Sequence, residues 1–187
     1  MEGAQVMEFM SSRPDVIRSI NQRWLLSYWN RVRGSTRIPL WVELEADEIP
    51  AMSASLAFFD VIENGGDARF LIRFRGQRIN EAFGHSGQGK FLDEVLPASY
   101  REAALTTYRQ VLVTQLPVYT FADLHDRDGR IVHYERLLLP FGRDGAAVDR
   151  ILASLETVSP EGAFEHRDIL KSAKKPPAFA LCTTIQH

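Results

Sequence analysis

Histidine is the side chain of this sequence best suited to chemistry, because imidazole titrates near neutral pH and binds metal ions. Of the five histidines, His125 and His133 flank a turn and could join Asp126 in a metal site. A structural zinc site shows four ligands at recognisable spacings, and this segment lacks such a set. We therefore interpret both histidines as half-exposed strand residues and predict no metal site.

Two other groups have suitable residue types but unsuitable spacing. Glu135 and Arg136 resemble a catalytic carboxylate and its orienting group, yet neighbours in a strand point to opposite faces. A structural ion pair or a partner contact fits them better. Gly84, Gly87 and Gly89 resemble a phosphate loop but lack the Gly-Lys-Ser/Thr ending, so we interpret them as a flexible connection. The spacing yields no Ser-His-Asp or paired-carboxylate set.

The composition is that of an ordinary globular chain. Its 187 residues carry a net charge of -2 at pH 7, which predicts one domain with extensions and argues against nucleic acid as a partner. The start has no basic, apolar leader, and no segment approaches the roughly 20 apolar residues that cross a bilayer. A single cysteine, Cys182, cannot form an internal disulfide. We predict a cytoplasmic protein that does not bind membranes.

The elements that must position any site are organised around a hairpin. Two strand-like runs, 118–125 and 131–139, flank a turn at 126–130, whose Asp-Gly pair supplies the positive φ of a tight reversal. This hairpin should form the centre of a small antiparallel sheet. A helix beginning at a capping box of Ser99 and Glu102 leads into it.

Three further strands complete the predicted sheet. Residues 56–62 and 69–75 form a second hairpin, and 150–158 form a fifth strand. In 69–75 apolar residues alternate with arginines, which is typical of a half-buried strand. Phe74 should therefore face the core and Arg75 should face water.

The N-terminal part predicts an amphipathic helix from about Pro14 to Gly34, with Ser12 at its start. Its apolar residues cover about half of the circumference, whereas one contact face needs only about 100°. Either the whole broad face covers the domain's own sheet, or part of it covers the sheet and part meets a second subunit, since large aromatic residues are typical interface anchors. The residues assigned to that interface are Ile17, Ile20, Trp24, Tyr28 and Trp29.

These elements divide the chain into three parts. Residues 1–46 hold the N-terminal helix and an extended connection, and 47–159 form the core domain. Residues 160–187 include a linker-like stretch, and we interpret them as a peripheral tail.

Several segments together resemble the family of stand-alone PAS domain proteins common in alphaproteobacteria. The closest match is YERLLLP at 134–140, followed by Asp144-Gly145. Tyr28-Trp29 and the segment 69–79 add to it. The resemblance covers roughly residues 24–158, and the order of strands, short helices, long helix and strands is that of a PAS domain.

The sequence departs from the family pattern in one loop, at Trp41, Glu43 and Ala46. These departures affect any role of that loop and leave the fold assignment unchanged. The resemblance implies an α+β fold in which a five-stranded antiparallel sheet carries short helices and one long helix on its concave face, preceded by the N-terminal amphipathic helix.

A PAS-like fold encloses a small cavity between the sheet and its helices. His85 should lie beside the mouth of this cavity or face water. The bulky apolar residues around the cavity either line a ligand site or simply fill the core, as such residues usually do. The candidate lining residues are Phe70, Ile72, Phe74, Phe83, His85, Leu105, Tyr108 and Leu112.

The resemblance implies a sensory or protein-interaction module for signal transduction, usually without a catalytic centre. We expect it to form a homodimer to which the N-terminal helix contributes, and to act through a partner protein. Haem-binding PAS domains commonly take a histidine from the long helix, and flavin-adduct PAS domains need a cysteine in the broken-helix region. Residues 100–115 have no histidine and 84–92 have no cysteine, so we predict neither cofactor.

Two alternatives remain for the function. One is a small cone-shaped α+β enzyme of the ketosteroid isomerase type, with Tyr108 and Glu135 as its converging donor and base. Its long helices would precede the strands, whereas here two strands precede the long helix. The other is a ligand-free scaffold with a filled core.

Overall fold

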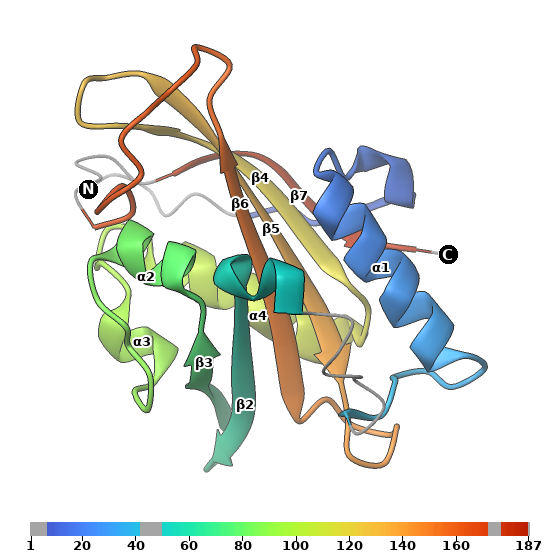
Figure 1. The fold of residues 1–187 in the computed structure, drawn as a ribbon. Coiled ribbons are helices and arrows are strands. Elements are labelled where there is room, and N and C mark those ends of the chain that lie inside the picture. Colours follow the sequence, from blue (N-terminus) through green and yellow to red (C-terminus); the bar gives the residue numbers. More distant parts are fainter. Residues whose placement is uncertain (1–6, 42–49, 172–176, 187) are drawn as a thin grey trace.

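The computed structural model describes residues 7–41, 50–171 and 177–186. The strands are β1 (Met10–Ser12), β2 (Leu56–Asn64), β3 (Asp67–Arg75), β4 (Val118–His125), β5 (Ile131–Phe141), β6 (Arg150–Val158) and β7 (Ala178–Ile185). The helices are η1 (Pro14–Val16), α1 (Ile20–Arg33), η3 (Pro50–Ser55), α2 (Gln77–Phe83), α3 (Leu92–Val95) and α4 (Arg101–Thr114), of which η1 and η3 are 3₁₀ helices. The strands form one sheet in the order β1-β7-β4-β5-β6-β2-β3 (Figure 1).

Helices cover both faces of this sheet. On one face lie α2, α3 and α4, where Phe59, Phe70 and Tyr108 belong to a common apolar core (Figure 1). On the other face lies α1, whose Leu25 and Trp29 pack into a second core. The sheet is therefore the middle layer of three, and its two faces are buried separately.

The sheet is wider than predicted. Five antiparallel strands are expected from the sequence, whereas seven are present and β1 pairs with β7 in parallel. The tail 160–187 is therefore not peripheral throughout, because β7 lies antiparallel along β4. β4 is buried on both faces, and without β7 its open edge could pair with another chain. The β-branched Thr-Thr-Ile at the end of β7 is a strand signal that the proline-rich stretch before it obscured.

The central hairpin forms as predicted. β4 pairs antiparallel with β5 over all of its residues, and Gly129 takes a φ of 84°. The Asp126 carboxylate accepts backbone N–H bonds from Asp128 at 2.9 Å and Arg130 at 2.8 Å. The aspartate thus fixes the turn from its own side chain, as Asx turns do.

The helix α1 begins later than the sequence predicts. Instead of a helix from Pro14 with Ser12 at its start, η1 comes first and Ser19 caps α1 by accepting the N–H of Gln22 at 3.3 Å. The cause is a tertiary contact, since the Ser19 N–H donates to the Glu135 carboxylate at 3.1 Å. This bond holds the chain extended just before the helix.

Two other helix ends were predicted from local signals. Gly34 ends α1 with a φ of 54°, as expected of a glycine at that position. α4 begins at Arg101, and its N-cap Tyr100 makes no side-chain cap bond, so the predicted box of Ser99 and Glu102 is wrong. The extended connection predicted within 1–46, and the start of the core at 47, lie partly outside the described residues. No helix in the described ranges is long and apolar enough to span a membrane.

Buried hydrogen bonds fix α1 to the sheet. The amide of Gln22 is fully buried and donates to the carbonyl oxygens of Glu135 at 3.2 Å and Ser154 at 3.1 Å. The indole N–H of Trp29 donates to the carbonyl oxygen of Pro140 at 2.7 Å. Because a buried carbonyl without a donor is costly, these bonds determine the position of α1.

We expect Trp29→Phe to lower the free energy of unfolding by about 1–3 kcal/mol, because it removes a buried hydrogen bond and part of the packing of a fully buried indole. Trp24→Phe is the matched control, since Trp24 lies on the same helix but is 40% exposed, and it should change stability by less than about 0.5 kcal/mol. Urea unfolding followed by circular dichroism measures both. Equal losses in the two variants would contradict the assignment.

Candidate functional site

A small enclosed cavity lies in the core between the sheet and helices α2 to α4. Its volume is about 20 Å³, a little more than the ~10–15 Å³ that one water molecule needs. Two guanidinium groups and three phenols reach it, although arginine is rarely buried in an apolar core. Its lining residues are Ala57, Phe59, Arg75, Ile79, Phe83, Leu92, Leu96, Tyr100, Tyr108, Tyr134, Arg136 and Leu155.

Arg75 enters the cavity because β3 contains a β-bulge. Phe58 pairs with Phe74 and Phe59 pairs with Ile72, so Arg73 is an extra residue without an opposite partner. An extra residue reverses the alternation of side chains beyond it. The predicted inward position of Phe74 is therefore wrong, and so is the predicted exposure of Arg75.

The side chains on both sides of the bulge confirm this reversal. Phe74 lies on the α1 face, 36% exposed, with its ring 5.6 Å from that of Phe58. Arg75 is only 5% exposed and packs its guanidinium over the Phe83 ring at 4.4 Å.

The partners of Arg75 are neutral groups. Its Nε donates to the Asn80 side chain at 3.1 Å and one terminal nitrogen donates to the His85 carbonyl at 2.9 Å. The other terminal nitrogen, Nη1, has no hydrogen-bond partner within the described residues. Burial lowers the pKa of Arg75 to about 10, so the group remains charged at neutral pH.

Arg136 reaches the same cavity from β5. It is 4% exposed, and one terminal nitrogen donates to the Thr107 hydroxyl at 2.6 Å. The Thr107 hydroxyl in turn donates to the carbonyl of Ala104 in α4 at 2.6 Å. In the part of the chain that is described, the Nε of Arg136 has no partner.

Three tyrosines complete the polar lining. Burial raises the pKa of Tyr100, Tyr108 and Tyr134 above the ordinary value of 10.0, so all three phenols keep their protons at neutral pH. The Tyr100 hydroxyl donates to the carbonyl of Leu170 at 3.1 Å. The cavity thus presents two cations and three neutral hydroxyl groups.

The candidate lining residues fall in different places. Phe83 and Tyr108 line the cavity. Phe70, Ile72 and Leu105 are buried in the surrounding core, and Leu112 packs against it. Sequence reasoning missed Arg75, Tyr100, Tyr134 and Arg136 as lining residues. The sequence gives one signal that Arg136 has a special position: it and Glu135 are consecutive ionisable residues inside an otherwise apolar strand.

The loop after α2 touches the cavity through its backbone. The His85 carbonyl accepts a hydrogen bond from Arg75, while the exposed His85 ring lies 6.2 Å from the Phe83 ring. Burial and the charge of Arg75 lower the pKa of His85. Gly87 has a φ of 62°, and an added Cβ there would lie 2.9 Å from Nη1 of Arg75. The glycine at this position therefore leaves room for the guanidinium group.

Tyr108 and Glu135 do not converge. Tyr108 lies in the core beneath α4, whereas the Glu135 carboxylate lies on the α1 face and accepts the Tyr119 hydroxyl at 2.8 Å and the Ser19 N–H at 3.1 Å. Glu135 and Arg136 point to opposite faces, as the sequence predicts. Neither forms a salt bridge among the described residues.

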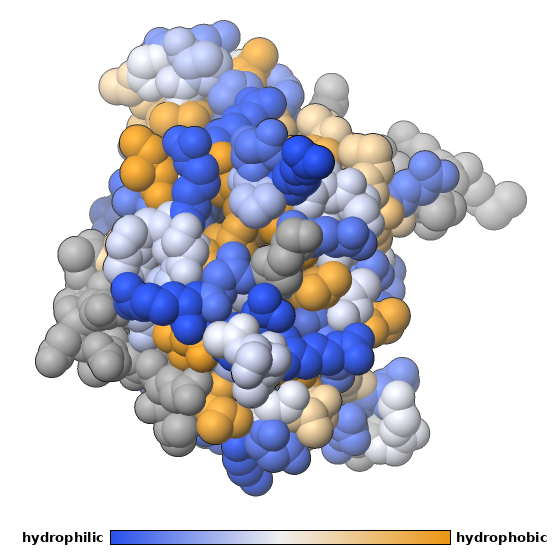
Figure 2. Space-filling model, turned by 90° about the vertical axis from the view of Figure 1, so that its right-hand side faces the viewer, coloured by the Kyte–Doolittle hydropathy of each residue, from blue (hydrophilic) through white to orange (hydrophobic). Residues whose placement is uncertain are grey.

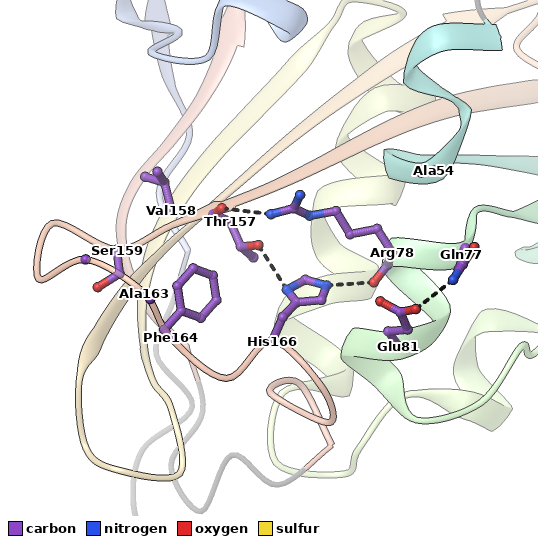
Figure 3. Close-up of a pocket in the computed structure, with 11 residues that line it drawn as sticks. Ala54, Gln77, Arg78, Glu81, Thr157, Val158, Ser159, Ala163, Phe164 and His166 are labelled. Atoms are coloured by element: carbon purple, nitrogen blue, oxygen red, sulfur yellow. Dashed lines mark hydrogen bonds between the residues drawn. The ribbon is translucent and has the colours of Figure 1, made fainter.

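A larger, open pocket of about 750 Å³ lies between α2 and the segment after β6 (Figure 3). His166 lies in it, but both ring nitrogens are engaged, one with the Arg78 carbonyl at 2.8 Å and the other with the Thr157 hydroxyl at 3.2 Å. Only an N–H can bond a carbonyl, so the Nε2 atom carries the proton. His166 therefore attaches the segment after β6 to α2, and no nitrogen of its ring is left for chemistry.

His133 and Asp126, two of the three groups considered for a metal site, are engaged in other contacts. The His133 ring contacts the Asp123 carboxylate at 2.7 Å, and Asp126 accepts backbone bonds in the turn. Across the described ranges, no group of three or more His, Cys, Asp or Glu side chains could hold a metal ion.

The residues assigned to a subunit interface separate into two sets. Ile17, Tyr28 and Trp29 are buried within the chain, while Ile20 is 76% and Trp24 40% exposed. Only the exposed pair remains available for a contact with another molecule.

A family model described as a PAS domain matches residues 17–156. The chain belongs to the PAS domain family. No curated protein matches it. The matched part of this PAS protein includes α1 and all residues that line the enclosed cavity, whereas β1 and β7 lie outside it.

Cys182 should react slowly in the folded protein. Burial raises the pKa of its thiol to about 11, from an ordinary value of 9.0, and only the thiolate is nucleophilic. At pH 8 we expect iodoacetamide to modify it at least about a hundredfold more slowly than an unfolded-state cysteine. Val113→Cys in a Cys182→Ser background is the control, because Val113 is 78% exposed. Equal rates at the two positions would contradict the prediction.

Proposed function

We propose that this PAS protein is a non-enzymatic sensory module that holds a small ligand in the cavity beneath α4 and acts through a partner protein in the cytoplasm. The observation that carries the proposal is the polar lining of an enclosed cavity in an otherwise apolar core. A core whose only task is stability gains nothing from buried charged groups.

A route from the cavity to the surface supports the sensory function. Tyr100 lines the cavity and bonds the carbonyl of Leu170. The same segment is bonded to α2, since the N–H groups of Asp168 and Leu170 donate to the carbonyls of Glu81 and Ala82 at 2.8 and 2.9 Å. A ligand that displaces Tyr100 would disturb this segment, which a partner could contact.

The enzyme alternative has less support. An isomerase of the cone type needs a base and a hydrogen-bond donor in one pocket, and Tyr108 and Glu135 lie on opposite faces of the sheet. The scaffold alternative predicts that the cavity never holds a ligand.

A second copy of the chain is our proposed partner for α1. Ile20 and Trp24 are four positions apart and share one face of the helix. Ile20 borders an open groove of about 540 Å³ that also contains Phe121 and Val158. On the side of the molecule shown in Figure 2, hydrophobic residues form separate groups among hydrophilic ones, and a limited apolar contact with a polar rim is typical of interfaces.

Native mass spectrometry of protein purified from its host tests the sensory proposal. We expect a noncovalent small molecule in a fraction of the protein, which disappears on denaturation. A homogeneous apo mass from several growth conditions, together with no stabilisation by a metabolite library in thermal scans, would favour the scaffold.

The dimer is tested with the double variant Ile20→Ser and Trp24→Ser. We expect light scattering to show a dimer for the unaltered protein at tens of micromolar and at least a tenfold weaker association for the variant, because the apolar contact is lost. Val113→Ser alters an equally exposed residue on α4 and should leave association unchanged. A monomer in all three samples would contradict the dimer.

A further inference from the structure

We propose that the cavity beneath α4 binds a small carboxylate anion through the guanidinium groups of Arg75 and Arg136. This inference rests on the proposed sensory function and names the chemical class of its ligand. Both side chains are buried and charged, and both have unused hydrogen-bond donors.

Among the described residues, the two arginines are buried cations without a counter-ion. They are 5% and 4% exposed, and the groups that they contact are uncharged: an amide, a carbonyl and hydroxyls. None of the described residues that line the cavity carries a carboxylate. Buried charges in proteins are paired, because an unpaired charge in a low-dielectric interior is strongly unfavourable. An anion in the cavity supplies the missing charge.

The unused donors lie on the same two groups. Nη1 of Arg75 and Nε of Arg136 are buried and have no partner among the described residues. A carboxylate has two acceptor oxygens, and guanidinium groups match its planar geometry. The phenols of Tyr108 and Tyr134 are protonated and add hydroxyl donors around it, whereas the Tyr100 hydroxyl is already bonded to the carbonyl of Leu170.

The size of the cavity limits the ligand. A volume of about 20 Å³ admits a group little larger than a water molecule, so a nucleotide or a haem does not fit. The remaining lining is apolar, with Phe83 among it, and leaves room for no substituent larger than a methyl group. Formate and acetate are therefore the appropriate probes.

Thermal unfolding in matched solutions tests the proposal. At about tenfold over its dissociation constant, acetate should raise the Tm of the protein by about 3 °C, compared with a bulky sulfonate salt at equal ionic strength. Acetamide has the same shape without the charge and should have no effect. Stabilisation by chloride but not by formate or acetate would overturn the carboxylate assignment.

Variants locate the effect. Arg75→Met and Arg136→Met should each abolish the acetate shift, while Arg109→Met, which removes a half-exposed charge on α4, should keep it. If the arginines were only structural, the acetate shift would persist in both variants.

A measurement on the unaltered protein decides the question if a variant fails to fold. In ¹⁵N-edited NMR spectra, the side-chain Nε–H resonances of Arg75 and Arg136 should move on titration with formate and stay fixed with acetamide. Fixed resonances with both probes would overturn the proposal.

A neutral molecule retained from the host would refute the carboxylate assignment and leave the sensory function intact. A bound carboxylate that changes neither association nor partner binding would refute the sensory function and leave the carboxylate assignment intact.

Discussion

The strict alternation of side chains along a strand is the constraint on which the interior of this protein depends, and β3 breaks it once. Because Arg73 has no residue opposite it, the side chains beyond it exchange faces. Phe74 joins the aromatic residues on the α1 face, and Arg75 takes its place in the core. Without that one residue the cavity would hold a phenylalanine and only one cation.

The second constraint is the isolation of the two faces of the sheet. Glu135 and Arg136 are neighbours in β5, yet the strand places the carboxylate beneath α1 and the guanidinium beneath α4. The pair therefore cannot neutralise itself. Each group finds separate partners, which fixes α1 through Ser19 on one side and α4 through Thr107 on the other.

The sequence predicts most of the elements, because their signals are local. The Asp-Gly turn sets the hairpin, and the bounds of β4 and the start of β5 follow from it. Phe83 and Tyr108 were also predicted to line the cavity. Long-range contacts determine what was missed. The bond from Ser19 to Glu135 places the start of α1 at Ile20, later than the local sequence predicts. The alternation of residues 69–75 gives no sign of the bulge in β3. β7 is held as a strand by its pairing with β4 and β1, which lie far from it in the sequence.

The parallel pairing of β1 with β7 brings Met10 beside Thr183, a separation of 173 positions along the chain. Contacts between such distant parts of a chain form slowly, because the long loop between them must close first. We therefore expect this pairing to be the last to form, after β2 to β6 have already assembled around the hairpin. Until residues 178–185 leave the ribosome and reach their place, the backbone of β4 stays uncovered, and chaperones or neighbouring nascent chains have that time to engage it.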